Sequence, residues 1–139
     1  MRLSWSWPLR VFIVLFCINV ASPALAAASR DTVSEEVAAL LSGLSASTCL
    51  FYRNGRWHEG PAAATHLQRK FDYIAERRTL QSTEEFIELG ASESSFSGRA
   101  YQVRCGQAEP QSSQSWLLIE LAKLRQAREK PAKSDKSAQ

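Results

Sequence analysis

The sequence contains few of the residues that carry chemistry in enzymes and metal sites. It has two histidines and three cysteines, and it has no CxxC or HxxxH pair that would hold a metal ion. It also lacks the GxSxG and SxxK motifs of serine hydrolases and the Asp-rich loop of an EF-hand. These absences exclude the familiar signatures of catalysis and metal binding. We expect no metal and no cofactor, and we assign no catalytic residue.

A large excess of charge of one sign is absent as well. The chain has 17 Lys+Arg and 14 Asp+Glu residues, a formal net charge of +3. Two of the arginines, Arg2 and Arg10, lie in the N-terminal segment described next, so the rest of the chain is close to neutral. A nearly neutral chain lacks the basic surface that binds nucleic acid, and we expect no such partner. A hydrophobic content of 45% in 139 residues suits one small globular domain and excludes a disordered chain.

The sequence does have an N-terminal export signal. Two arginines flank the start of an apolar run over residues 11–21, and Pro23 follows the run. Residues 24–26 form a small-x-small cleavage sequence, and a second cleavage frame ends at residue 28. The run is shorter than the roughly 20 apolar residues of a membrane-spanning helix, which favours a cleaved signal peptide over an uncleaved anchor. We expect residues 1–26 to be removed and the mature chain, without a transmembrane segment, to be periplasmic.

Export leaves two of the three cysteines, because Cys17 belongs to the signal peptide. The remaining pair, Cys49 and Cys105, predicts a disulfide in a small exported domain. Two buried free thiols and a metal site are the alternatives, and no ligand spacing supports the metal. Cys49 starts one predicted strand and Cys105 ends another. Antiparallel pairing of these strands would bring both cysteines to the same end, as a disulfide requires.

The spacing of apolar residues predicts about four helices and three strands. Helices are expected over residues 29–48 and 61–78, with a capping box at residues 32–35 in the first of them. A second capping box, at residues 82–85, opens a short third helix, and a fourth helix is expected around Trp116. Strands are expected over residues 49–53, 56–59 and 100–105, with Asn54-Gly55 as the hairpin turn.

We therefore predict an α+β domain over residues 29–127, stapled by one disulfide. Its small antiparallel sheet of about three strands packs against about four helices on one side. Residues 128–139 are rich in Lys, Ala and Ser and predict a disordered tail.

Four short motifs stand out between the two cysteines. They are the hairpin Phe51–Gly55, the helical segment His66–Lys70, the capped segment Ser82–Ile87 and the Ser-rich loop with its following tyrosine, Ala91–Tyr101. Together they resemble the YfeK-like family of small exported proteins, whose domain has no known function. The resemblance implies export and a compact domain. Family members often carry proline directly before the tyrosine, and this chain has Ala100 there.

Polar residues gather in three places that are candidates for a binding surface. On the second helix His66, Lys70, Tyr73 and Arg77 follow one another at helical spacing, beside the apolar face. The other two places are the Ser-rich loop and the hairpin tip. From these three places we select, as the candidate binding surface, Arg53, Asn54, His66, Lys70, Ser94, Ser95 and Ser97. Lys70 is in position to reach the loop or a bound anion.

Two functions fit these observations. The first is a noncatalytic binding or accessory module of the cell envelope, whose partner is an envelope protein or an anionic envelope component. The alternative is a small hydrolase with a nucleophilic serine in the loop and His66 or His58 as its base, which requires that the serine and the base lie within hydrogen-bond distance.

Overall fold

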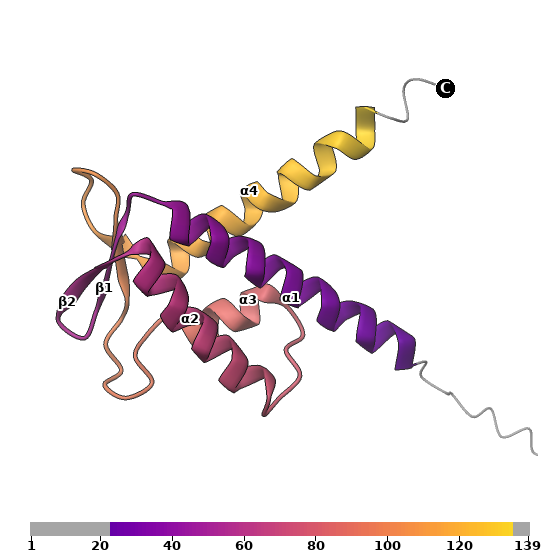
Figure 1. The fold of residues 1–139 in the computed structure, drawn as a ribbon, viewed down its shortest axis with the longest axis horizontal. Helices are drawn as coiled ribbons and strands as arrows, with labels where there is room; N and C mark the ends of the chain where they lie inside the picture. Colours follow the sequence, from indigo (N-terminus) through magenta and orange to yellow (C-terminus); the bar gives the residue numbers. More distant parts are fainter. Residues whose placement is uncertain (1–22, 135–139) are drawn as a thin grey trace, which may run out of the picture.

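Helices occupy most of residues 23–134, the part of the chain that the computed structural model describes (Figure 1). The helices are α1 (Pro23–Ala46), α2 (Gly60–Ala75), α3 (Thr83–Phe86) and α4 (Ser113–Ser134), and a π-helical turn, η1 (Ile87–Ala91), follows α3. Most of the predicted signal peptide and the last residues of the predicted tail lie outside the described residues.

The first helix begins earlier than its apolar pattern predicts. The structure begins α1 at Pro23, so residues 32–35 lie inside the helix and the capping box predicted there is wrong. The alanines of residues 24–28 have the highest helix propensity of any residue type and favour helix upstream of the amphipathic part. The predicted cleavage points after residues 26 and 28 therefore lie in the first turns of α1.

The capping box at the start of α3 is confirmed. The Ser82 hydroxyl accepts a hydrogen bond from the Glu85 N–H at 3.1 Å, and the Glu85 carboxylate accepts one from the Gln81 N–H at 2.7 Å. These two bonds satisfy amide donors that a helix start leaves unpaired. They set the direction in which α3 and η1 leave the preceding loop.

The sheet has four antiparallel strands in the order β2-β1-β3-β4, one more than the sequence predicts. The strands are β1 (Leu50–Arg53), β2 (Arg56–Glu59), β3 (Gln102–Arg104) and β4 (Gln111–Ser112). The additional strand, β4, lies in a segment predicted to be a loop. It has two exposed residues, too few for an alternating apolar pattern that would reveal a strand.

Both predicted links within the sheet are present. Asn54 and Gly55 have positive φ angles of 51° and 83°, as a type I′ turn between β1 and β2 requires. Cys49 and Cys105 form a disulfide, with a Cα–Cα distance of 4.2 Å. The disulfide lies next to the pair Leu50 and Arg104, the last residues matched between β1 and β3. It therefore closes one end of the central strand pair.

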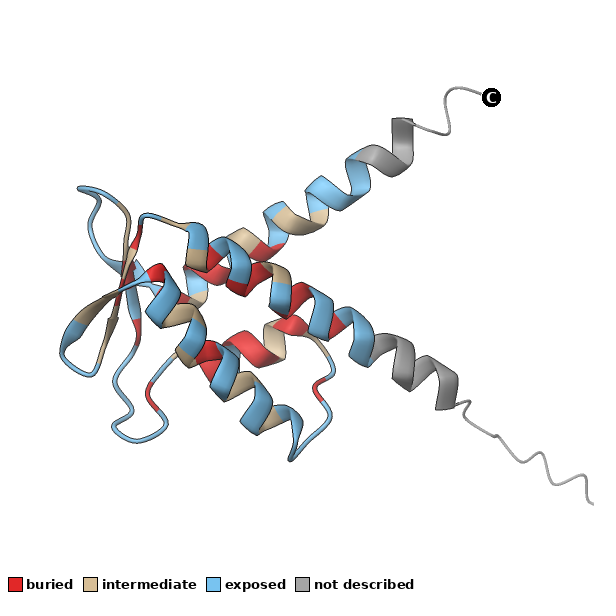
Figure 2. Ribbon diagram, viewed as in Figure 1, coloured by how far each residue is buried: buried red, intermediate tan, exposed pale blue. Residues whose placement is uncertain are grey.

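One face of the sheet packs against the helices, as predicted. Phe51 and Val103 are paired across β1 and β3 and are both buried, and the Phe51 ring contacts Trp116 of α4 edge-on at 5.4 Å. Behind them the buried sides of the helices face one another (Figure 2). The apolar residues that recur at helical spacing along α1 are all buried: Val33, Val37, Leu40, Leu41 and Leu44.

A buried carboxylate, which the sequence did not suggest, joins α1 to α3 and α4. Arg125 donates two hydrogen bonds of 2.8 Å to Glu36, which is 7% exposed, and one of 2.5 Å to Glu84. Thr83 donates a further bond to Glu36 at 2.6 Å. The hydrogen bonds from Arg125 lower the pKa of Glu36 to about 2 although burial opposes this. Loss of Arg125 would leave a buried, unpaired carboxylate, a cost of about 3 kcal/mol or more.

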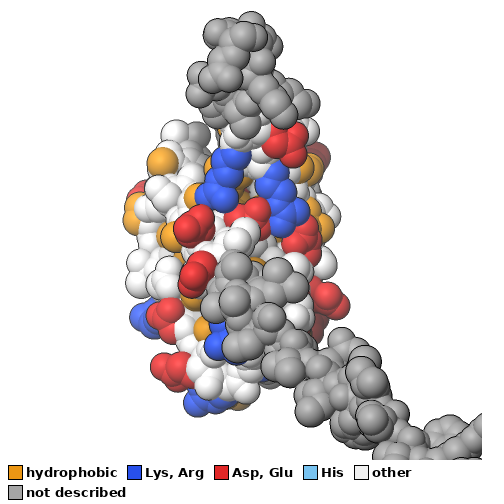
Figure 3. Space-filling model, turned by 90° about the vertical axis from the view of Figure 1, so that its right-hand side faces the viewer, with side chains coloured by type: hydrophobic (Ala, Val, Ile, Leu, Met, Phe, Trp, Pro, Cys, Tyr) orange, Lys and Arg blue, Asp and Glu red, His pale blue; other side chains and the backbone are white. Residues whose placement is uncertain are grey.

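The helix ends beyond this network project away from the sheet. In Figure 3, which looks at that side, acidic and basic side chains lie next to one another and no face of a single charge forms. α4 continues to Ser134, past residue 127, where we expected the domain to end, and residues 126–130 are exposed. The disorder expected of residues 128–139 stays a prediction.

Reduction of the disulfide should destabilise the protein strongly. The bridge joins residues 56 positions apart, and a loop of that length corresponds to about 4 kcal/mol of chain entropy in the unfolded state. We expect reductant to lower the melting temperature by more than about 10 °C in a thermal scan. The Cys49→Ser/Cys105→Ser variant should melt at the reduced value with or without reductant. An equal melting temperature for the oxidised and reduced protein would contradict this stabilising role.

Candidate functional site

The polar stripe predicted on the second helix lines a groove. His66, Lys70 and Tyr73 lie on successive turns of α2, and Arg77 lies in the turn directly after the helix, which ends at Ala75, earlier than its spacing predicts. The groove has a volume of about 540 Å³, within the range of small-molecule binding sites. Its lining consists of His66, Arg69, Lys70, Tyr73, Ile74, Arg77, Arg78, Leu89 and Ser95. None of these residues carries a carboxylate.

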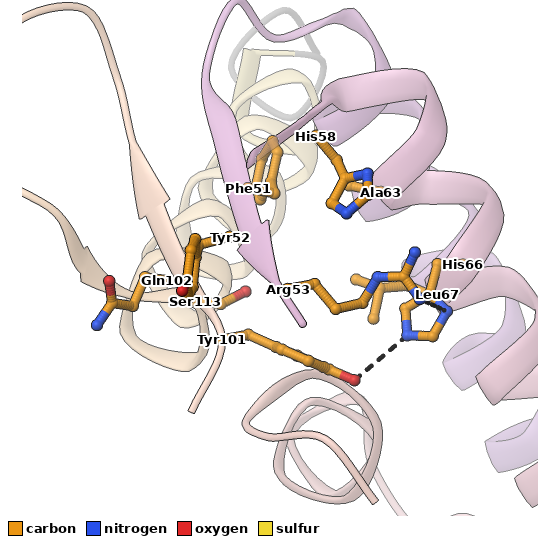
Figure 4. Close-up of a pocket in the computed structure, with 10 residues that line it drawn as sticks. All are labelled: Phe51, Tyr52, Arg53, His58, Ala63, His66, Leu67, Tyr101, Gln102 and Ser113. Atoms are coloured by element: carbon orange, nitrogen blue, oxygen red, sulfur yellow. Dashed lines mark hydrogen bonds between the residues drawn. The ribbon is translucent and has the colours of Figure 1, made fainter. Parts of the chain in front are cut away.

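His66 lies at one end of the groove and is held from two sides. Arg53 of β1 approaches its Nδ1 at 3.1 Å, and the Tyr101 hydroxyl lies 3.3 Å from its Nε2 (Figure 4). A guanidinium can only donate, so Nδ1 accepts and the proton of a neutral ring is on Nε2. Nε2 then donates to Tyr101. The contact therefore specifies one tautomer of His66 and joins α2 to the two central strands.

The charges around His66 are all positive. Burial lowers the pKa of His66 to about 4, and the neighbouring Arg53, Lys70 and Arg69 lower it further in the same direction. His66 is therefore neutral at pH 7. Because the ring is neutral, it adds no further positive charge to those of Arg53, Lys70 and Arg69.

Lys70 connects α2 to the Ser-rich loop, as the sequence analysis anticipated. Its Nζ donates to the Glu93 carbonyl oxygen at 3.1 Å and lies 5.2 Å from the centre of the Tyr101 ring. Burial lowers the pKa of Lys70, the Glu93 carboxylate raises it and Arg53 lowers it. Among residues 30–130 the Lys70 ammonium forms no ion pair, and its hydrogen bond to Glu93 is to the backbone oxygen. Lys70 therefore carries a half-buried charge that is balanced only in part.

The Ser-rich loop is shaped by Ser94. Its N–H donates to the Arg99 carbonyl at 2.9 Å, its carbonyl accepts from the Gly98 N–H at 2.8 Å, and its hydroxyl accepts from the Ser97 N–H at 3.3 Å. Gly98 has a φ of 64°, which closes the turn. Ser94 itself is buried. The loop is thus a built turn that presents Ser95, Phe96 and Ser97 to solvent.

The structure brings five of the seven predicted binding residues to this region: Arg53, His66, Lys70, Ser94 and Ser95. Asn54 stays exposed at the hairpin turn and Ser97 on the outside of the loop. Arg53 does not extend into solvent as a hairpin-tip charge, because its guanidinium turns back to His66. His58, the alternative base of the hydrolase hypothesis, is half-buried on the helix-facing side of β2, opposite Phe51.

Sequence reasoning missed Tyr101 and Arg69 as site residues. Tyr101 directly precedes β3, two residues before buried Val103, so the alternation of a strand would have placed it on the helix-facing side. Burial raises the pKa of its hydroxyl, whereas Arg53 and the Ser94 side chain lower it. Arg69 follows no pattern that separates it from an ordinary exposed arginine. Only the groove identifies it.

The geometry gives the hydrolase alternative no support. Both His66 nitrogens are engaged, by Arg53 and Tyr101, and Nε2 already carries a proton. Ser94 uses its hydroxyl within its own turn. The enclosed space between Arg53, His66 and Tyr101 has a volume of about 20 Å³, enough for one water molecule and too small for an organic substrate. Within residues 30–130, neither His66 nor His58 forms a hydrogen bond to a serine of the loop.

Comparison with known proteins gives one match. Residues 31–125, more than half of the chain, match the family described as "Family of unknown function (DUF5329)". No curated protein and no solved structure matches the chain.

The low pKa of His66 predicts how stability depends on pH. The pKa is about 4 in the folded protein against 6.5 in an unfolded chain, so protons bind preferentially to the unfolded state between these values. Stability should fall by about 1–3 kcal/mol as the pH decreases from 6.5 to 4, measured by urea unfolding. The His66→Gln variant should lose this part of the dependence, and His58→Gln should keep it.

The same pKa can be read directly from the imidazole resonances in NMR spectra. The His58→Gln variant leaves His66 as the single histidine of the sequence, so the remaining imidazole signal belongs to His66. A midpoint near 6.5 for that signal would contradict the buried, doubly engaged ring.

Proposed function

Because this chain belongs to the family of unknown function DUF5329, we propose its function from the groove itself. We propose that it is an exported, periplasmic protein that binds an anionic component of the cell envelope without catalysing a reaction. The observation that carries the proposal is the lining of the groove, with four basic side chains and no carboxylate. Electrostatic attraction to such a surface requires an anion on the partner.

The free positive charge lies at the His66 end of the groove. Arg77 pairs with Glu76 at 3.4 Å, and Arg78 pairs with Glu85 at 2.6 Å. Within residues 30–130, Arg69, Lys70 and Arg53 form no ion pair, and they are the cations that lower the pKa of His66. An anion should therefore bind beside Arg69 and Lys70.

Partial burial strengthens this argument. A half-buried cation has lost part of its hydration, and without a counter-charge that loss is not offset. For Lys70 the loss is offset only in part, because burial, the largest cause of its lowered pKa, outweighs the opposing effect of the Glu93 carboxylate. A bound anion would accept charge-assisted hydrogen bonds, each contributing about 1.5–3 kcal/mol.

Three features support export. The N-terminal segment has the pattern of a signal peptide, and the resemblance to the YfeK-like proteins implies the same destination. A structural disulfide persists in oxidising compartments such as the periplasm.

Within residues 23–134, the structure contains no helix that is both long and apolar enough to cross a bilayer.

Export can be tested by the mass of the protein from a periplasmic fraction. We expect a chain that begins after residue 26 or 28 and that gains the mass of two hydrogen atoms when a reductant converts Cys49–Cys105 to two thiols. An unprocessed chain in the membrane fraction would contradict the proposed location.

Anion binding can be tested with inorganic pyrophosphate as the probe. We expect chemical-shift changes in the NMR spectrum that centre on Arg69, Lys70 and Ser95 and that weaken as salt is added. The Arg69→Gln variant should bind at least about fivefold more weakly, because it removes one charge-assisted contact of at least about 1 kcal/mol. Arg69 holds no part of the fold, so this variant should remain folded.

The matched control is Arg56→Gln, which removes the same charge from the exposed start of β2, outside the groove. It should bind pyrophosphate as the unmodified chain does. Equal weakening by both variants would mean that the probe senses net charge only, and the proposed site would be wrong.

A further inference from the structure

The groove that carries the unpaired cations also carries much of the exposed apolar surface. Single exposed hydrophobic side chains are common on protein surfaces, but several that gather at one groove mark a binding surface. Among the described residues, five large hydrophobic side chains are exposed: Tyr73, Leu89, Phe96, Leu118 and Ile119. Tyr73 and Leu89 line the groove, and Phe96 directly follows its lining residue Ser95. The remaining two lie on α4.

Phe96 is fully exposed, at 101% of its reference area, on a loop that is already built. The hydrogen bonds of Ser94 to Arg99, Gly98 and Ser97 hold the turn on which it stands. An aromatic side chain on a preformed turn loses little further conformational freedom when it binds. Its exposure therefore suits contact with an apolar group rather than packing within this chain.

The two ends of the groove differ in character. At the His66 end, Arg69 and Lys70 have no carboxylate partner. At the other end the arginines are neutralised, and the Arg77 guanidinium lies flat against Tyr73, 3.5 Å from the centre of its ring. Ile74 and Leu89 line the same part. The groove is thus cationic at one end and apolar along the rest.

We propose that the groove binds a single molecule of an anionic amphiphile, with its charged head beside Arg69 and Lys70 and its alkyl chain along Ile74 and Leu89, beneath Phe96. This inference rests on the proposed anion binding and names the class of ligand. From His66 to its end at Ala75, α2 is about 14 Å long, which gives room for both parts of such a molecule.

Charge complementarity favours a single amphiphile over a bilayer surface. Exposed carboxylates are present on or next to each element that lines the groove: Asp72 on α2, Glu76 directly after it, Glu88 on η1 and Glu93 before the loop turn. These carboxylates would be repelled by the anionic head groups of a bilayer surface. One head group inside the groove faces only its basic lining.

The experiment is a series of alkyl phosphates, from phosphate through ethyl, butyl and hexyl to octyl phosphate, each below its micelle concentration. Binding to the processed chain is measured by calorimetry. We expect affinity to rise by up to about fourfold for each buried methylene group. Octyl glucoside, which has the same chain without the charge, should bind at least about tenfold more weakly than octyl phosphate.

Variants test where the chain lies. Leu89→Ser and Phe96→Ser should flatten the dependence on chain length and leave the affinity for phosphate unchanged. Leu118→Ser removes a similarly exposed leucine from α4, 38% exposed against 39% for Leu89, and should have no effect.

The outcomes separate this inference from the proposed function. If phosphate binds and the series is flat, the amphiphile is wrong and the anion site stands. If neither phosphate nor octyl phosphate binds, both proposals fail. Equal binding of octyl glucoside and octyl phosphate would refute the charged head. Binding to vesicles of phosphatidylglycerol without binding of octyl phosphate would show surface docking and overturn the single-molecule site.

Discussion

The antiparallel pairing of β1 with β3 is the constraint on which the candidate site depends. The disulfide closes this pair at one end, and the buried residues Phe51 and Val103 fix its register against the helices. At the other end of the pair, β1 ends at Arg53 and Tyr101 directly precedes β3. Both side chains reach His66 of α2 from there. A slip of one residue would turn every side chain of a strand to the opposite face and separate the three groups.

His66 shows how a polar residue can be structural and still shape a binding surface. The ring does not act as a base, because Nδ1 accepts a hydrogen bond from Arg53 and Nε2 donates one to Tyr101. Its neutrality matters more, since a protonated ring would add a further charge to Arg53, Arg69 and Lys70. The region thus keeps its cations close together without a carboxylate among them. Such an arrangement is costly for stability and useful for binding an anion.

Much of the fold could be predicted because its signals are local. The hairpin turn follows from the φ angles that Asn54 and Gly55 tolerate, and the start of α3 from the cap at Ser82. The disulfide follows from the position of two cysteines at the ends of strands. The start of α1 and the strand β4 could not be predicted in the same way. The first depends on the propensity of alanines outside the amphipathic pattern, and the second on two residues whose pairing has no signature in the sequence.

The sequence by itself determined that His66, Lys70 and Tyr73 share one side of a helix, because helical periodicity depends only on spacing, whereas Arg77 lies just past the end of that helix. It also determined which residues form the loop and the hairpin. Only the tertiary structure decided that Arg53 turns inward, that Tyr101 completes the site, and that Glu36 is buried against Arg125. These contacts join residues 13, 35 and 89 positions apart. Their partners are set by how the helices and the sheet pack together, and no local pattern records that.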